Sequence, residues 1–409
     1  MPESRSEIAR HWAIVLASGI GIGAGVTGIP FYTLGLFVQP LGEEFTWTRA
    51  QVQGMFTVFS VAGLLVVPMI GWLTDNLGVR RLVLLSLSGT VLGYVGLALL
   101  TRSIPSFYLA AALIAVLGAG TTPITWTKAI SGWFDRQRGL ALGLALSGTG
   151  FAALTAPNYV AWLLDRFGWR EAYLGLALIP LVALPFVYLF LKDPPGTTGG
   201  QNSTEQAHTG VTLSQAVRDW KLWLIFLSFF LLSGAIGGSI PNLVPMMMDA
   251  SIDRGKAASI VGLIGLAVIA GRVVVGFCID RFWAPGVAAV VQSLPVISAL
   301  ILIQPELSIP LVSAAVILIG FAAGAEFDLI AYLVGRYFGL RHYAKIYVIP
   351  YAGFAIAAGI MPTLFGHLFD LHGSYTLVMK ICAAMFGSGA LMLLALGRYP
   401  QFGAQQQDQ

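Results

Sequence analysis

Long apolar runs separated by short polar connections make up most of the chain. Runs of about 20 residues are long enough to cross the hydrocarbon core of a bilayer as a helix. Twelve such runs are present, at residues 12–39, 51–73, 82–101, 107–130, 139–164, 172–191, 221–247, 257–279, 285–303, 308–335, 345–369 and 375–397. The pattern therefore predicts an all-α membrane protein with twelve transmembrane helices embedded in a lipid bilayer.

The composition supports this prediction and excludes other classes. Of 409 residues, 57% are hydrophobic and 10% are charged, whereas a soluble domain carries about 25% charged residues. The net charge of +4 is too small to suggest a nucleic-acid partner. Cys278 and Cys382 match no metal-ligand spacing, and no His, Cys or Ser constellation has catalytic spacing. We therefore expect no enzyme, no metal and no cofactor.

Charge placement predicts the topology and the domain boundaries. An even number of spans puts both termini on one side, and most Lys and Arg residues fall in loops on that side, so both termini are expected in the cytoplasm. The one long polar stretch, 193–220, is rich in Gly, Ser, Thr and Gln and is expected to be a cytoplasmic linker. It separates two six-helix bundles, at residues 1–192 and 221–409.

The two halves repeat in sequence. The segment Gly71–Asp75 (GWLTD) matches Gly276–Asp280 (GFCID), and Gly150–Ala152 matches Gly353–Ala355 at nearly the same offset. Matches at one offset are hard to obtain by chance, and secondary transporters build a midplane site between such repeats. We therefore expect two pseudo-symmetric bundles that move a solute by alternating access.

Arg272 is a single charge inside the apolar run 257–279. Eight residues separate it from Asp280, so it would lie roughly 12 Å below the membrane surface at a helical rise of about 1.5 Å per residue. A guanidinium there costs at least about 2.5–3.5 kcal/mol, so it should face the protein interior or water and have a partner. A carboxylate substrate suits its fork of donors. The alternative is a structural ion pair within the bundle.

A first motif, GWLTDNLGVRR at 71–81, resembles the loop motif between helices 2 and 3 of the major facilitator superfamily. Asn76 departs from it, because a basic residue is usual there. The resemblance implies the major facilitator fold and a gating role for this loop. We extend that role to its counterpart in the second half. The expected gating residues are Gly71, Asp75, Gly78, Arg80, Arg81, Asp280 and Arg281.

A second motif, WFDRQRGLALGLALSGTG at 133–150, is similar to the helix 4 to helix 5 motif of the monocarboxylate transporters and their bacterial oxalate and formate exchanger relatives. This resemblance implies a small organic anion as substrate and a bacterial inner membrane as location. In that family an arginine on helix 8 binds the substrate carboxylate, and Arg272 occupies the matching place. Proton-coupled animal members carry an aspartate one turn earlier, where this chain has Val268.

Three further ionisable residues lie inside apolar runs. Glu326 and Asp328 are two positions apart, so on a helix they point about 200° from each other and cannot both face a central cavity. Either could carry a coupled proton, or both could neutralise cations between substrates. Lys128 could be a second anion ligand or could extend its long stem to the cytoplasm. Four aromatic residues are candidates for cavity lining or for ordinary packing: Tyr32, Trp126, Tyr332 and Tyr351.

These observations predict a secondary active transporter of small organic anions, in particular monocarboxylates, coupled by proton symport or by exchange for a counter-anion. Arg272 would bind the carboxylate, and Asp328 or Glu326 would couple the proton. We expect the protein to work as a monomer. Two alternatives remain open at this point. One is efflux of an apolar or cationic drug with the acidic pair as its site, and the other is a non-transporting nutrient sensor on the same fold.

Overall fold

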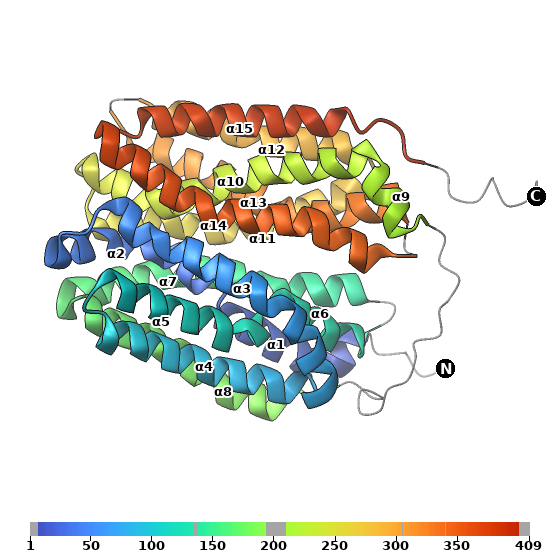
Figure 1. Ribbon diagram of the computed structural model, residues 1–409, viewed down its shortest axis with the longest axis horizontal. Helices are drawn as coiled ribbons and strands as arrows, with labels where there is room; N and C mark the ends of the chain where they lie inside the picture. Colours follow the sequence, from blue (N-terminus) through green and yellow to red (C-terminus); the bar gives the residue numbers. More distant parts are fainter. Residues whose placement is uncertain (1–6, 135–136, 194–209, 305, 340, 401–409) are drawn as a thin grey trace, which may run out of the picture. The chain divides into compact units, whose positions relative to one another are not determined.

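The computed structural model describes residues 7–134, 137–193, 210–304, 306–339 and 341–400 (Figure 1). Apart from one isolated bridge between Gly210 and Gly339, the regular elements in these ranges are helices. They are α1 Glu7–Gly23, α2 Ile29–Phe45, α3 Arg49–Leu77, α4 Val79–Leu100, α5 Ile104–Leu117, the 3-10 helix η1 Ala119–Thr121, α6 Pro123–Ser131, α7 Arg138–Phe167, α8 Trp169–Phe190, α9 Leu213–Arg218, α10 Trp220–Asp249, α11 Arg254–Ile279, α12 Ala284–Leu302, α13 Ile309–Phe338, α14 Tyr343–His372 and α15 Thr376–Leu394.

Ten helices in the described ranges are long and apolar enough to span a membrane, which confirms the predicted all-α membrane fold. The other two expected runs, 12–39 and 107–130, differ from a single continuous helix. The first is broken between α1 and α2 within a glycine-rich segment, and α2 restarts with proline in its first turn. The second is divided into α5, η1 and α6, where Thr122 is extended and Pro123 begins the new helix.

The described residues form two compact units. Unit 1 combines the described parts of 1–201 with residues 240–266, and unit 2 combines those of 202–239 with 267–409. Both boundaries of the inserted piece lie inside long helices, so α10 and α11 contribute to each unit. The expected division at 193–220 follows the sequence repeat, whereas these units follow the packing. Residues 194–209 of the expected linker lie outside the described ranges, and the short helix α9 follows them.

In unit 1, α4 packs along α8 and α1 packs along α7 (Figure 1). The pairing of α1 with α7 depends on glycine, because a Cβ on Gly148 would lie 2.1 Å from the carbonyl oxygen of Gly19. The end of α10 reaches α2 in the same way, since a Cβ on Gly35 would lie 2.3 Å from the Pro241 carbonyl oxygen. Small residues that bring helix backbones together are the usual means of packing within a membrane.

In unit 2, α12 packs along α15 and α13 (Figure 1), and α13 crosses α11. Two glycines bring the backbones of α11 and α13 into contact. A Cβ on Gly271 would lie 2.1 Å from the Phe321 carbonyl oxygen, and one on Gly324 would lie 2.2 Å from the Val268 carbonyl oxygen. A side chain at either position would push the helices apart. This crossing therefore fixes how residues that follow it on each helix face one another.

Candidate functional site

The helix crossing in unit 2 places Arg272 of α11 beside Asp328 of α13. The Nε atom of Arg272 lies 3.3 Å from Oδ2 of Asp328. The Arg272 side chain is 10% exposed and the Asp328 side chain is 33% exposed, so the pair is largely shielded but has one accessible side. Arg272 directly follows Gly271, and Asp328 lies one turn after Gly324, so the two glycines position both charged groups.

The ion pair leaves the donors of Arg272 unfilled. Nε and Nη1 of the guanidinium are buried without a hydrogen-bond partner among the described residues. A guanidinium has five N–H donors in a fixed fork that matches a carboxylate. Leaving buried polar groups without partners costs about 1–3 kcal/mol each. The site therefore has both the charge and the free donors to hold a carboxylate.

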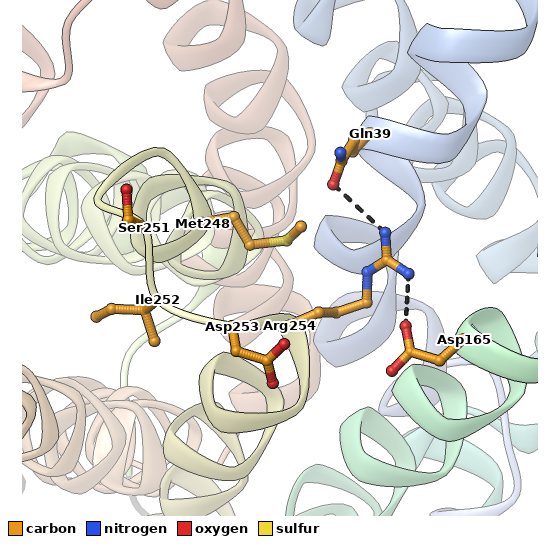
Figure 2. Close-up of a pocket in the computed structure, with 7 residues that line it drawn as sticks. All are labelled: Gln39, Asp165, Met248, Ser251, Ile252, Asp253 and Arg254. Carbon is orange, nitrogen blue, oxygen red and sulfur yellow. Dashed lines mark hydrogen bonds and ion pairs between the residues drawn. The ribbon is translucent and has the colours of Figure 1, made fainter.

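Arg254, at the start of α11, provides a comparison within the same helix. Its Nη1 donates to Oδ1 of Asp165 at 2.7 Å and its Nη2 donates to Oε1 of Gln39 at 3.4 Å. Figure 2 shows this guanidinium reaching between the two acceptors at a shallow pocket of about 440 Å³. Both terminal nitrogens of Arg254 are used by the protein, whereas Nη1 of Arg272 has no partner among the described residues.

Glu326 lies on a different face of α13 from Asp328 and does not join the pair. Its side chain is 3% exposed, and its Oε1 has no hydrogen-bond partner among the described residues. The face of α13 that carries it packs on α12, because Gln292 of α12 donates to the carbonyl oxygen of Ala322, one turn before Glu326. The predicted divergence of the two carboxylates thus places Asp328 alone beside Arg272.

Two of the predicted site tyrosines lie near Asp328, Tyr332 on α13 and Tyr351 on α14. The Tyr332 hydroxyl, one turn after Asp328, donates to the Ile279 carbonyl oxygen at 3.0 Å and ties α13 to the end of α11. Tyr351 of α14 stacks on Tyr347, with ring centroids 5.8 Å apart. Its ring centroid is also 6.3 Å from that of Phe327, the residue before Asp328.

Val268 packs its backbone against Gly324 and is 3% exposed. The position that carries an aspartate in the related animal transporters is therefore part of the helix contact in this chain. The carboxylate beside Arg272 comes instead from α13. The sequence offered Asp328 and Glu326 as carboxylates that could neutralise buried cations but left the choice open, because the contact depends on a pair of glycines on two helices far apart in the chain.

Three candidates from the first half of the chain lie in unit 1. Trp126 of α6 is fully buried, its ring covers Gly21, and its Nε1 donates to the Thr121 carbonyl oxygen at 3.0 Å. It has no exposed surface with which to contact a substrate in this conformation. Lys128 of α6 and Tyr32 of α2 are both half-buried, and the Tyr32 ring lies 5.3 Å from Phe31.

The expected gating loop joins α3 to α4. Gly78 adopts φ 79°, in the region that favours glycine, and ends α3. Asp193, at the end of the first half, accepts a hydrogen bond from the Arg80 backbone N–H at 2.9 Å and so caps the start of α4. The Arg80 guanidinium lies 4.7 Å from the Tyr188 ring centroid. Sequence analysis did not predict either Asp193 or Tyr188 as partners of this motif.

The remaining gating candidates are less constrained. Gly71 and Gly276 have open space where a Cβ would stand. Arg81, Asp280 and Arg281 are exposed, and the Arg281 guanidinium lies over the Phe277 ring. The Asp75 side chain lies outside what the structure describes.

Unit 1 contains polar contacts that the sequence did not indicate, at the ends of α10 and α11 expected to face outward. Gln53 of α3 and Asn242 of α10 exchange two hydrogen bonds, of 2.8 and 3.2 Å, and both are fully buried. Arg49 pairs with Asp249 at 2.7 Å. These contacts join the end of α10 to α3, while Arg254 joins the start of α11 to α7.

Comparison of the sequence with known proteins identifies the family and several relatives. The family model described as Major Facilitator Superfamily matches residues 20–349. The uncharacterized MFS-type transporter YhjX of Escherichia coli is 25% identical over 80% of this chain and 81% of its own length. Monocarboxylate transporter 13 of Bos taurus is 25% identical over 96% of this chain and 91% of its own.

Solved structures show the same fold. The crystal structure of a bacterial homologue of the human lysosomal transporter Spinster, in an inward-facing and unoccupied conformation, matches with a TM-score of 0.66. The match covers 96% of this chain and 94% of that one at 16% sequence identity. An occupied inward-facing form matches equally well.

Proposed function

The chain belongs to the Major Facilitator Superfamily and is therefore a multi-pass secondary transporter rather than an enzyme, and we propose that its substrates are small organic anions, specifically monocarboxylates. The observation that carries this proposal is the Arg272 guanidinium, which lies beside Asp328 and whose buried Nε and Nη1 have no hydrogen-bond partner among the described residues. The 25% identity to monocarboxylate transporters over nearly the full chain supports the same substrate class.

In the proposed mechanism, Asp328 neutralises Arg272 when the site is empty. A carboxylate that binds Arg272 brings a second negative charge next to Asp328, which is unfavourable in a low-dielectric site. Uptake of one proton by Asp328 removes that repulsion and frees Arg272 for the substrate. The empty site holds one positive and one negative charge, and the loaded site holds the same total with the substrate carboxylate in place of Asp328.

This scheme accounts for proton symport without the aspartate that is missing at Val268. If Asp328 stays ionised, the site must instead carry an anion in each direction, which is exchange. Glu326 is the other carboxyl that could take up a proton, although it lies apart from Arg272. Lys128 and Tyr32 remain predicted substrate contacts of unit 1. We leave Trp126 out of the proposed site because it is fully buried and its indole N–H is already bonded.

The test is uptake of labelled pyruvate or acetate by purified protein in liposomes, with and without an inward proton gradient. We expect Arg272→Ala to abolish uptake and Arg272→Lys to leave a small fraction of it, because an ammonium lacks the bidentate fork. The matched control is Arg254→Gln, which removes a guanidinium from the same helix. Full transport by Arg272→Ala would contradict the assignment of the site. Uptake of no carboxylate by the wild type would contradict the substrate class.

A further inference from the structure

A row of stacked aromatic rings runs along one face of α14. Tyr343, Tyr347 and Tyr351 follow one another at four-residue intervals, which places them on the same helix face, and Phe354 continues the row. Successive ring centroids are 5.7, 5.8 and 6.1 Å apart, with interplanar angles of 19°, 23° and 14°. We call these four residues the aromatic ladder. It extends over about 16 Å at the helical rise.

The aromatic ladder lies beside the part of α13 that carries Asp328. Phe327 contacts the end of the ladder formed by Tyr351 and Phe354, and its ring centroid is 6.3 Å from that of Tyr351 and 4.6 Å from that of Phe354. The Tyr343 hydroxyl at its other end donates to the Ala331 carbonyl oxygen at 3.3 Å. Asp328 lies between Phe327 and Ala331 on α13, so these two contacts bracket it. The middle of the ladder is therefore level with the ion pair.

The rings are only half-buried, so part of the ladder is accessible. The Tyr343 hydroxyl is bonded, but those of Tyr347 and Tyr351 make no hydrogen bond to any residue that the structure describes. Val348, which directly follows Tyr347, is 55% exposed and aliphatic. The contacts with Phe327 and Ala331 show that the tyrosine row lies along α13.

Accessible aromatic faces with polar tips, next to an arginine with unfilled donors, have the composition of a ligand site. A small carboxylate such as acetate would use the guanidinium and leave the rings uncovered. A carboxylate that carries a planar ring would also stack on them, which adds the favourable energy of an aromatic pair. The tyrosine hydroxyls would stay available for water or for a polar ring substituent.

We propose that the aromatic ladder makes the transporter selective for carboxylates that carry an aromatic ring. This rests on the proposed function, because Arg272 holds the carboxylate while Tyr347 and Tyr351 stack against the ring. Among monocarboxylates, those with an aromatic ring would therefore be bound best.

The experiment measures inhibition of acetate uptake by phenylacetate in liposomes containing the full chain. We expect phenylacetate to compete at a concentration about tenfold below that of unlabelled acetate. Tyr347→Leu and Tyr351→Leu should each weaken phenylacetate competition by between about twofold and tenfold, the range that one aromatic pair contributes. Competition by acetate should weaken less than competition by phenylacetate in both variants, because acetate has no ring to stack. Tyr347→Phe keeps the ring and should retain the preference, and Tyr343→Phe also keeps its ring while removing the hydroxyl that donates to Ala331, so it should retain the preference too.

The outcomes separate the inference from the function on which it rests. If the wild type takes up acetate but phenylacetate competes no better, the aromatic selectivity is wrong while the transport of carboxylates stands. If the leucine variants lose acetate and phenylacetate equally, the ladder has a structural role and the inference is also overturned. If the wild type takes up and binds neither carboxylate, the proposed function fails together with the inference.

Discussion

Two polar pairs in this protein differ in how far their hydrogen-bonding groups are satisfied. In unit 1, Gln53 and Asn242 exchange two hydrogen bonds and are fully buried. In unit 2, Arg272 and Asp328 form an ion pair at 3.3 Å, yet Nε and Nη1 of the arginine have no hydrogen-bond partner among the described residues. The first pair is neutral and each partner satisfies the other. The second is charged and incomplete, which is costly unless a ligand completes it.

The first pair is suited to stabilising the fold, and the second is suited to binding a substrate. The amides of Gln53 and Asn242 bond to each other rather than to a ligand, and they stabilise the packing of α3 on the end of α10. An under-satisfied arginine contributes less to stability and more to binding. This comparison can be tested by removing one member of each pair.

The largest effect is expected at Asp328. Asp328→Asn keeps the shape of the side chain but removes its charge and its capacity to carry a proton. We expect a proton gradient to drive no accumulation of substrate in this variant, while exchange of preloaded carboxylate continues. The measurement is uptake into liposomes under an imposed proton gradient, or with substrate already present on the opposite side of the membrane.

Glu326→Gln is the matched control and should keep proton-driven uptake. Loss of coupling in Glu326→Gln with coupling intact in Asp328→Asn would move the proton site to Glu326.

An intermediate effect is expected at Gln53. Gln53→Leu removes the two hydrogen bonds that Gln53 exchanges with the buried Asn242 amide, which should lower the free energy of unfolding by about 1–3 kcal/mol. The thermal unfolding midpoint of purified protein in detergent measures this. The double variant Gln53→Leu with Asn242→Leu should recover part of the loss, because no amide is then left unpaired. Equal destabilisation in the single and double variants would show that the pair is not the stabilising element.

The smallest effect is expected at Arg254. Its salt bridge with Asp165 lies at the surface, with side chains 20% and 52% exposed, and such pairs contribute about 0–1 kcal/mol. Arg254→Gln should therefore shift the unfolding midpoint by little and should retain carboxylate uptake. A loss of uptake as complete as that expected for Arg272→Ala would show that the two arginines of α11 do not differ in the way that their hydrogen bonding suggests.

Hydropathy was sufficient to predict the helical membrane fold, because apolar length and charge placement are local properties of the sequence. It could not predict the breaks after Gly23 and around Gly118. There the apolar run continues, and only backbone conformation at glycine and proline interrupts the helix. The superfamily was also predictable, since the motif at 71–81 is short and specific.

Arg272 was predictable as a candidate because a lone charge in an apolar run is conspicuous. Its partner was not, because spacing shows only that Glu326 and Asp328 diverge, and the choice between them depends on how α13 meets α11. Gln53 and Asn242 gave no signal at all. They are neutral residues 189 positions apart, and no local pattern distinguishes a paired amide from an isolated one.

The crossing at Gly271 and Gly324 has an electrical consequence. Because it holds Arg272 and Asp328 together within one unit, the guanidinium and its neutralising carboxylate must travel as one group. A lone arginine carried across the full membrane potential would gain or lose about 2.3 kcal/mol per 100 mV. A paired one carries no net charge through the field. The return of the empty carrier should therefore be nearly independent of membrane voltage, whatever voltage dependence the loaded step has.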